Sequence, residues 1–224
     1  MNPWAPNIRA PTPMCDVHGD STNSIGPRLA MTAAHVAGVG VAAYLLLERG
    51  VSSRAVVVLV CSLAYFLRYL LTSFYLLSRR VGWSEAAQVG PFLFAIQALF
   101  GFLASGRTAP LRWLDWIALG IYVLGSFLNT EAELQRKRWK ADPAHKGHLY
   151  RGGLFSLSMH VNYFGDVLLF KGFALVTSSV WALLIPLLMA IMFVLVHIPM
   201  LDSYLAQRYP EEFSEWARET GWLK

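Results

Sequence analysis

The stretch from Val180 to Met200 has the sequence VWALLIPLLMAIMFVLVHIPM, in which His197 is the only side chain that can carry a charge. An α-helix rises about 1.5 Å per residue and the hydrocarbon layer of a bilayer is about 30 Å thick, so about 20 apolar residues are needed to cross it. This segment meets that length. It therefore predicts a membrane-spanning helix and indicates that the chain is an integral membrane protein.

Five further apolar segments precede it along the chain. They are Leu29–Leu47, Ala55–Leu77, Val89–Ala104, Leu114–Leu128 and Leu154–Thr177. The chain of 224 residues is 55% hydrophobic and 15% charged, which is more apolar than one soluble core of this length needs. We therefore expect an all-α fold, a polytopic transmembrane helical bundle of about six spans.

The two ends of the chain differ from this apolar middle. Residues 1–28 are rich in Pro, Ser, Asn and Gly, which predicts a disordered leader, and they lack the apolar run of a secretory signal peptide. Residues 201–224 place aromatic and aliphatic side chains among alternating charges, as in an amphipathic cytoplasmic tail. The predicted organisation is a leader (1–28), a bundle (29–200) with a cytoplasmic loop (131–153), and a tail (201–224).

The net charge of +5 comes from basic residues in short loops between apolar runs. That placement indicates membrane topology and contact with anionic headgroups, and we expect no nucleic-acid partner. The loops after the second and fourth segments hold eight basic residues, and those after the first and third hold four. Because basic loops stay in the cytoplasm, both termini and the 131–153 loop are predicted to lie there. Cys15 and Cys61 form no CxxC pair, and we expect neither a disulfide nor a metal site from them.

Polar side chains interrupt the apolar segments near one end of the predicted bundle. Asn129 and Glu133 are four residues apart, as are Asn162 and Asp166, so each pair shares one face of a helix. Polar groups are costly in hydrocarbon, so they should face the bundle interior or a wet cavity that opens to the cytoplasm. Each residue also has a plain structural explanation. His160 could be an ordinary core histidine, for example, and Asp166 could neutralise Lys171.

Taken in order, these residues resemble a known pattern. The segment YRGGLFSLSMHVNYFGD at residues 150–166, the upstream Asn129 and Glu133, and the downstream GFALVT and YPEEFSEWARETG are together similar to the steroid 5α-reductase family. The resemblance covers roughly residues 125–220. It implies a multi-pass membrane enzyme that transfers hydride from NADPH to an activated C=C bond in a steroid-like or other lipid substrate. Such an enzyme would lie in the endoplasmic reticulum of a eukaryote or the inner membrane of a bacterium.

The resemblance also implies residue roles. The NADPH site, facing the cytoplasm, would be lined by Asn129, Glu133, Tyr150, Arg151, Asn162 and Asp166, with His160 in the same shell. Upstream, FYLLSRR at residues 74–80 is similar to the family's Tyr-x-x-x-Asn-Arg, although the asparagine is absent. Arg79 or Arg80 would there hold a phosphate through charge-assisted hydrogen bonds.

Other family features are missing from this chain. It has no Gln-Glu pair of the kind that polarises the substrate carbonyl, and Met159 and Val161 replace an arginine and a proline of the related reductases. The six apolar segments predict one N-terminal helix fewer than is usual in the family. Hydride addition to an enone builds negative charge on the carbonyl oxygen, so an acid is still required. The candidates are Tyr69 and Tyr75, with Arg68 as an electrostatic partner. Arg68 is an intramembrane cation and could equally have a structural role.

Two alternatives remain open from the sequence. One is a membrane methyltransferase of the isoprenylcysteine type, which shares the helical architecture and a His-Pro-x-Tyr-x-Gly run but uses S-adenosylmethionine. The other is a catalytically inactive relative that acts as a membrane scaffold. Asn162 and the Asn129 and Glu133 pair favour the reductase, whereas the absent Gln-Glu pair favours the scaffold.

Overall fold

The computed structural model describes residues 24–48 and 50–220. Within that part every regular element is a helix and no strand occurs, which confirms the all-α fold predicted from the long apolar segments. Most of the predicted leader, including Cys15, lies outside the described residues, as does Trp222 in the tail. The first helix begins at Ile25, so the last four residues of the predicted leader belong to the bundle.

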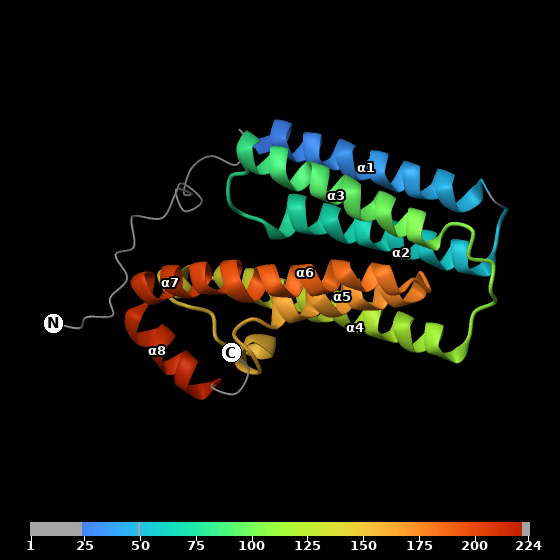
Figure 1. Cartoon of the computed structure of the whole chain (residues 1–224). Coiled ribbons are helices and arrows are strands. Elements are labelled where there is room, and N and C mark those ends of the chain that lie inside the picture. The colour runs from blue at the N-terminus through green and yellow to red at the C-terminus, as the bar shows by residue number, and fades with distance from the viewer. Residues whose placement is uncertain (1–23, 49, 221–224) are drawn as a thin grey trace.

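The helices form two layers (Figure 1). The first layer holds α1 (Ile25–Leu47), α2 (Ser53–Leu70) with its π-helical end η3 (Leu71–Leu76), and α3 (Trp83–Ala104). The second holds α4 (Trp113–Lys140), α5 (Val161–Val176), and α6 (Leu184–Met192), which continues through the π turn η7 (Phe193–His197) into α7 (Ile198–Arg208). Short 3-10 helices occupy Pro143–His145, Gly153–Ser156 and Val180–Leu183, and α8 (Pro210–Glu219) turns away from the end of α7.

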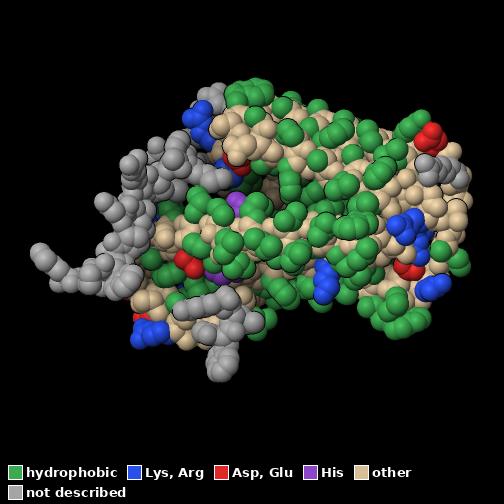
Figure 2. All heavy atoms as spheres, in the orientation of Figure 1, with side chains coloured by type: hydrophobic (Ala, Val, Ile, Leu, Met, Phe, Trp, Pro, Cys, Tyr) green, Lys and Arg blue, Asp and Glu red, His purple; other side chains and the backbone are tan. Residues whose placement is uncertain are grey.

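In the part of the chain that the structure describes, four helices are long and apolar enough to span a membrane. They are Ile25–Leu47, Ser53–Leu76, Trp83–Ala104 and Val180–Arg208. Hydrophobic side chains cover the sides of the bundle, whereas most charged side chains on the face in Figure 2 gather at its two ends. All six predicted segments form helices, but α4 and α5 are not among the four, and α5 has only 16 residues. The expected count of six spans therefore stays a prediction.

Glycines set the distance between α4 and α5. A Cβ atom built on Gly125 would lie 2.3 Å from the backbone nitrogen of Leu169, and one on Gly172 would lie 2.4 Å from that of Tyr122. A Cβ on Gly165 would lie 2.7 Å from the backbone nitrogen of Asn129. Small residues allow helix backbones in membranes to approach this closely. The seam holds Asn129 directly against the first turns of α5.

Aromatic side chains join the two layers. Phe100 of α3 is fully buried and stacks on Phe173 of α5 with ring centroids 4.2 Å apart and on Phe170 at 6.2 Å. At the end of the bundle where α2 and α4 begin, Arg54 forms an ion pair with Asp115 at 2.7 Å and donates to the carbonyl of Val176. The layers are thus fixed by an aromatic core in the middle and by a buried ion pair at one end.

Two helix bounds differ from the predicted segments. α4 continues to Lys140 and so extends into the predicted loop 131–153, whose cytoplasmic location stays a prediction. The predicted segment Leu154–Thr177 becomes α-helical only at Val161, since Gly153 has a φ of +57°, a left-handed conformation that glycine adopts readily and that breaks a helix. The tail packs against the bundle, with Trp216 buried and its indole N–H donating to the carbonyl of Phe155 at 2.9 Å, whereas its cytoplasmic location stays a prediction.

Candidate functional site

The polar residues of α4 and α5 form one hydrogen-bonded network. The side-chain amide of Asn162 donates to Glu133 at 3.0 Å, and that of Asn129 donates to the backbone carbonyl of Asn162 at 2.9 Å. The glycine seam is the cause, because it allows these two helices to meet without intervening side chains. Asn129 and Glu133, which were expected to share one face of a helix, both contact Asn162 of α5.

Arg68 of α2 completes this network from the other layer. Its Nη2 donates to Asp166 at 2.5 Å and to Asn129 at 2.8 Å. Its Nε and Nη1 atoms are buried without a hydrogen-bond partner in the described part of the chain. Lys171 is exposed, so Asp166 neutralises Arg68 and the explanation that it neutralises Lys171 is wrong.

Two more buried atoms of the network region have no partner among the described residues. His160 places Nε2 3.3 Å from a carboxylate oxygen of Asp202 on α7 and stacks on Tyr163, but its Nδ1 is unpaired. The Oδ1 of Asn162 is also unpaired. Buried polar atoms normally have partners, and leaving one unpaired costs about 1–3 kcal/mol. Donors and acceptors of this kind are what a bound ligand can satisfy.

An aromatic pocket of about 570 Å³ lies beyond the end of α4. Trp139 stacks face to face on His145 with centroids 4.1 Å apart, and Tyr150 lies 5.3 Å from the same indole. Glu212 of α8 also lines the pocket. Burial alone would raise the pKa of Glu212, but hydrogen bonds from His148 and from the backbone N–H of Leu149 hold that pKa below its usual value.

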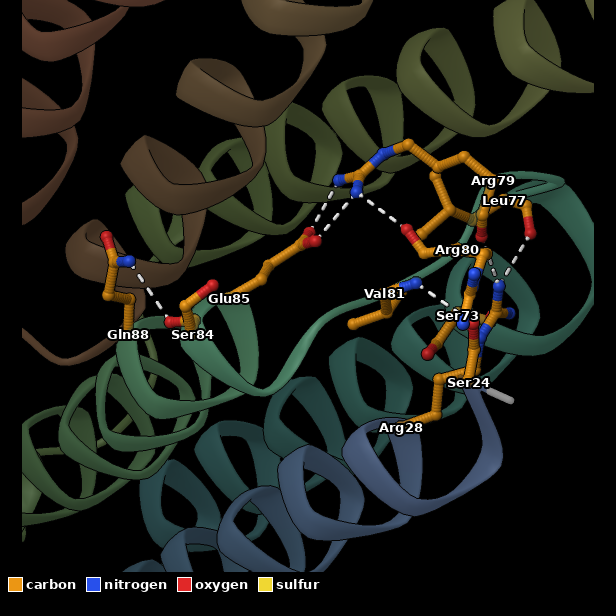
Figure 3. Close-up of polar contacts among 10 residues, drawn as sticks. All are labelled: Ser24, Arg28, Ser73, Leu77, Arg79, Arg80, Val81, Ser84, Glu85 and Gln88. Atoms are coloured by element: carbon orange, nitrogen blue, oxygen red, sulfur yellow. Dashed lines mark hydrogen bonds and ion pairs between the residues drawn. The ribbon is translucent and has the colours of Figure 1, made fainter. Parts of the chain in front are cut away.

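Two of the three arginines expected at the cofactor site, Arg79 and Arg151, have carboxylate partners. Arg79 forms two hydrogen bonds to Glu85 at 2.6 and 2.5 Å, pointing toward the first turn of α3, as Figure 3 shows. Arg151 pairs with Glu215 of α8 at 2.9 Å, and Arg80 is exposed. Arg28 donates to the backbone carbonyls of Leu77 and Arg79, which fixes the turn that carries these arginines (Figure 3).

The two tyrosines expected to donate a proton are not part of the network. Tyr75 is 53% exposed, and its ring lies 4.2 Å from the ammonium group of Lys137, so its role as a catalytic acid stays a prediction. Tyr69 places its hydroxyl 3.5 Å from the backbone carbonyl of Arg28. Its ring packs on His35. Neither residue contacts the Asp166 carboxylate.

Sequence reasoning missed Tyr65, His35 and Gln97. Tyr65 is buried, and its ring centroid lies 6.0 Å from the Arg68 guanidinium. Its position three residues before Arg68 could have indicated this contact, because residues three apart share a helix face. His35 and Gln97 are both fully buried, with Gln97 Nε2 2.9 Å from His35 Nε2, and His35 packs against Tyr65. A polar residue in each of two apolar spans could have indicated this pair.

Comparison of the sequence with known protein families identifies the family to which the chain is related. The model of the family described as "Protein of unknown function (DUF1295)" matches residues 86–220, which is more than half of the sequence. The chain belongs to the DUF1295 family. This family is related to steroid 5α-reductase/methyltransferase-like membrane proteins, so the resemblance noted from the sequence holds at that coarser level. Asn129, Glu133, His160, Asn162 and Asp166 all lie inside the matched region.

One curated relative of this DUF1295 chain is named as an enzyme. The "Probable O-methyltransferase ustE" of Ustilaginoidea virens is 32% identical over 120 residues, which is 52% of this chain and 41% of that protein. The chain therefore spans less than half the length of this relative. This similarity favours the methyltransferase alternative, which therefore stands as a second candidate next to the reductase.

Proposed function

We propose that the chain is a membrane enzyme that reduces an activated C=C bond of a lipophilic substrate with NADPH, at a site facing the cytoplasm. The observation that carries this proposal is the guanidinium of Arg68. Asp166 and Asn129 hold it in place, while its Nε and Nη1 groups are buried and have no partner among residues 24–48 and 50–220. Fixed donors in an apolar interior stabilise an oxygen that gains negative charge, and hydride addition to an enone creates such an oxygen.

Each protein group then has a part in the reaction. NADPH, when bound, supplies a hydride to the β-carbon of the enone. Arg68 would donate hydrogen bonds to the carbonyl oxygen as the electron pair moves onto it. Tyr65, packed beside Arg68, would supply the proton that the α-carbon needs, in the place first given to Tyr75. Asp166 keeps the guanidinium oriented and balances its charge.

The remaining residues fit a dinucleotide. The unpaired Oδ1 of Asn162 and Nδ1 of His160 suit the polar edge of a nicotinamide carboxamide, which carries both a donor and an acceptor. Arg79 and Arg151 have side chains that are about one-third exposed, and surface ion pairs contribute only about 0–1 kcal/mol. Exchanging their carboxylate partners for phosphate oxygens would therefore cost little. Tyr150 lines the aromatic pocket into which such a ligand would extend.

The second candidate function is an S-adenosylmethionine-dependent O-methyltransferase, favoured by the name of the relative from Ustilaginoidea virens. In that reaction the N–H groups of Arg68 would position the acceptor oxygen. The carboxylates of Glu133 and Asp166 would lie near the positively charged sulfonium of the methyl donor. The same network would suit both reactions. The two candidate functions are therefore distinguished by which cofactor the protein binds.

Thermal unfolding of the purified protein in detergent, with NADPH or with S-adenosylmethionine, tests the proposal. A ligand that binds only the folded state stabilises it by about 2.7 kcal/mol at one hundred times its Kd. We expect NADPH to raise the midpoint and the methyl donor to leave it unchanged. Stabilisation by S-adenosylmethionine alone would establish the second candidate. Stabilisation by neither would overturn both enzymes and leave the inactive scaffold.

A further inference from the structure

A groove of about 400 Å³ runs between α2 and α4 on the side of the bundle. It is lined by Ala64, Tyr122, Val123, Ser126, Phe127, Thr130 and Glu131. Val123 and Phe127 are 63% and 55% exposed, and such apolar side chains on a spanning bundle contact lipid. The volume lies in the range of small-molecule pockets. The groove therefore opens sideways to the hydrocarbon layer, and the aromatic pocket at Trp139 is a separate space.

The groove leads toward the Arg68 network. Ala64 precedes Arg68 by one helical turn on α2, and Ser126 precedes Asn129 by nearly one turn on α4, so each pair shares a face. Both helices run toward the same end of the bundle (Figure 1). Arg68 and Asn129 are joined there by the 2.8 Å hydrogen bond. The groove thus lies about one helical turn from the buried N–H groups of Arg68 that lack a partner within the described chain.

We propose that this groove is the binding site of the lipophilic substrate, which enters from the membrane and places a carbonyl oxygen at the Nε and Nη1 groups of Arg68. The inference rests on the proposed function in taking the occupant to be the substrate. The head group is a neutral carbonyl, because Asp166 already balances the charge of Arg68 and the carboxylate of Glu131 lines the groove. A carboxylate ligand would meet like charge there, which disfavours it.

Photolabelling with two single-chain lipids tests this site. One probe is a long-chain methyl ketone with a diazirine in its alkyl chain, and the other is the fatty acid with the same chain and diazirine. The detergent-solubilised full chain is irradiated without cofactor, and the labelled peptides are mapped by mass spectrometry. We expect the ketone to label residues 122–131 more strongly than the acid does.

Two tryptophan variants provide a matched comparison. Ala64→Trp fills the groove, whereas Leu63→Trp adds the same side chain at the adjacent exposed position, which does not line the groove. We expect Ala64→Trp to lower ketone labelling of residues 122–131 about tenfold, the equivalent of about 1.4 kcal/mol. Leu63→Trp should keep wild-type labelling. Arg68→Gln should also lower ketone labelling, because the donors of the guanidinium are lost.

Equal labelling of the two tryptophan variants would overturn the groove as the site. Labelling by the acid that is as strong as labelling by the ketone would overturn the neutral carbonyl as the head group. Because no cofactor is present, the result is independent of the cofactor titration. Groove labelling in a protein that binds neither NADPH nor S-adenosylmethionine would keep the lipid site and remove only the proposed reaction.

Discussion

Arg68 of α2 and Asp166 of α5 are 98 positions apart in the sequence and form an ion pair of 2.5 Å inside the bundle. Their side chains are 11% and 20% exposed. The pair connects the layer that holds α2 to the layer that holds the polar network of α4 and α5. A charge that loses its partner in such a place stays desolvated without compensation, so each residue depends on the other.

The first prediction concerns this pair. Asp166→Asn keeps the shape of the side chain but leaves Arg68 without a counter-charge, and we expect a loss of about 3–5 kcal/mol in unfolding free energy. Chemical unfolding in detergent measures it. The double variant Arg68→Gln with Asp166→Asn should lose less than the sum of the single losses, because no lone charge remains. Strictly additive losses would mean that the two residues do not interact energetically.

The second prediction concerns the seam between α4 and α5. Gly125→Ala would place a Cβ 2.3 Å from the backbone nitrogen of Leu169, so the helices must separate, at a cost of about 1–3 kcal/mol. Gly120→Ala on the same helix meets nothing within 4 Å and is the control. It should be neutral or stabilising, since alanine favours helix more than glycine does. Equal unfolding midpoints for the two variants would contradict the close seam.

The third prediction concerns Asn162. Asn162→Ala removes its hydrogen bond to Glu133 and the acceptor proposed to meet the cofactor, and we expect NADPH affinity to fall about tenfold or more. The measurement is a binding titration on protein whose folding yield is determined in parallel. Lys171→Ala, an exposed position on α5, should bind as the wild type does. Unchanged affinity in correctly folded Asn162→Ala would remove this residue from the site.

The fourth prediction concerns Glu212 and acid pH. Hydrogen bonds from His148 and Leu149 lower its pKa in the folded state below the ordinary 4.5. A lowered folded pKa contributes stability that is fully present above the unfolded value and is lost as pH falls through the folded value. The docking of α8 should therefore weaken below about pH 4.5, seen as lower hydrogen-exchange protection in residues 210–219 relative to the intrinsic exchange rate at each pH. Glu212→Gln should remove this pH dependence, and a variant that keeps it would place the titrating group elsewhere.

The fifth prediction concerns topology. Lys146 lies in the loop after α4 and Arg107 in the loop before it, at opposite ends of the bundle. The excess of basic residues predicts that Lys146 faces the cytoplasm. Single cysteines at the two positions should react with an impermeant thiol reagent from opposite sides of sealed vesicles. Reaction from one side only would show that α4 does not cross the bilayer.

Relationships between site residues that lie on the same helix were predictable from the sequence. Asn129 with Glu133, and Asn162 with Asp166, follow from helical spacing alone, and the structure brings both pairs together. The meeting of α4 with α5 was implied by the family resemblance. Its physical cause, the contact of glycine with backbone, depends on tertiary structure and is not visible in a single sequence.

Two features of the site could not be predicted from the sequence: the contacts between helices and one irregular turn. Nothing in the sequence pattern pairs Arg68 with a residue 98 positions away. Tyr75 is seven residues after Arg68, a spacing that in an α-helix would place both on one face. The chain forms a π-helical turn over Leu71–Leu76, whose larger turn rotates the following side chains, and Tyr75 faces outward. Hydropathy and spacing do not reveal such a turn.

The two glycine seams have a consequence for motion. Where Gly125 meets Leu169, and where Gly101 meets Ala42 between α1 and α3, backbone touches backbone and no flexible side chain can absorb sliding. We expect α1 with α3, and α4 with α5, to move as two rigid bodies. The stacking of Phe100 on Phe173 and the ion pair of Arg54 with Asp115 join these two bodies to each other. We therefore expect the groove between α2 and α4 to keep its width when a ligand occupies it.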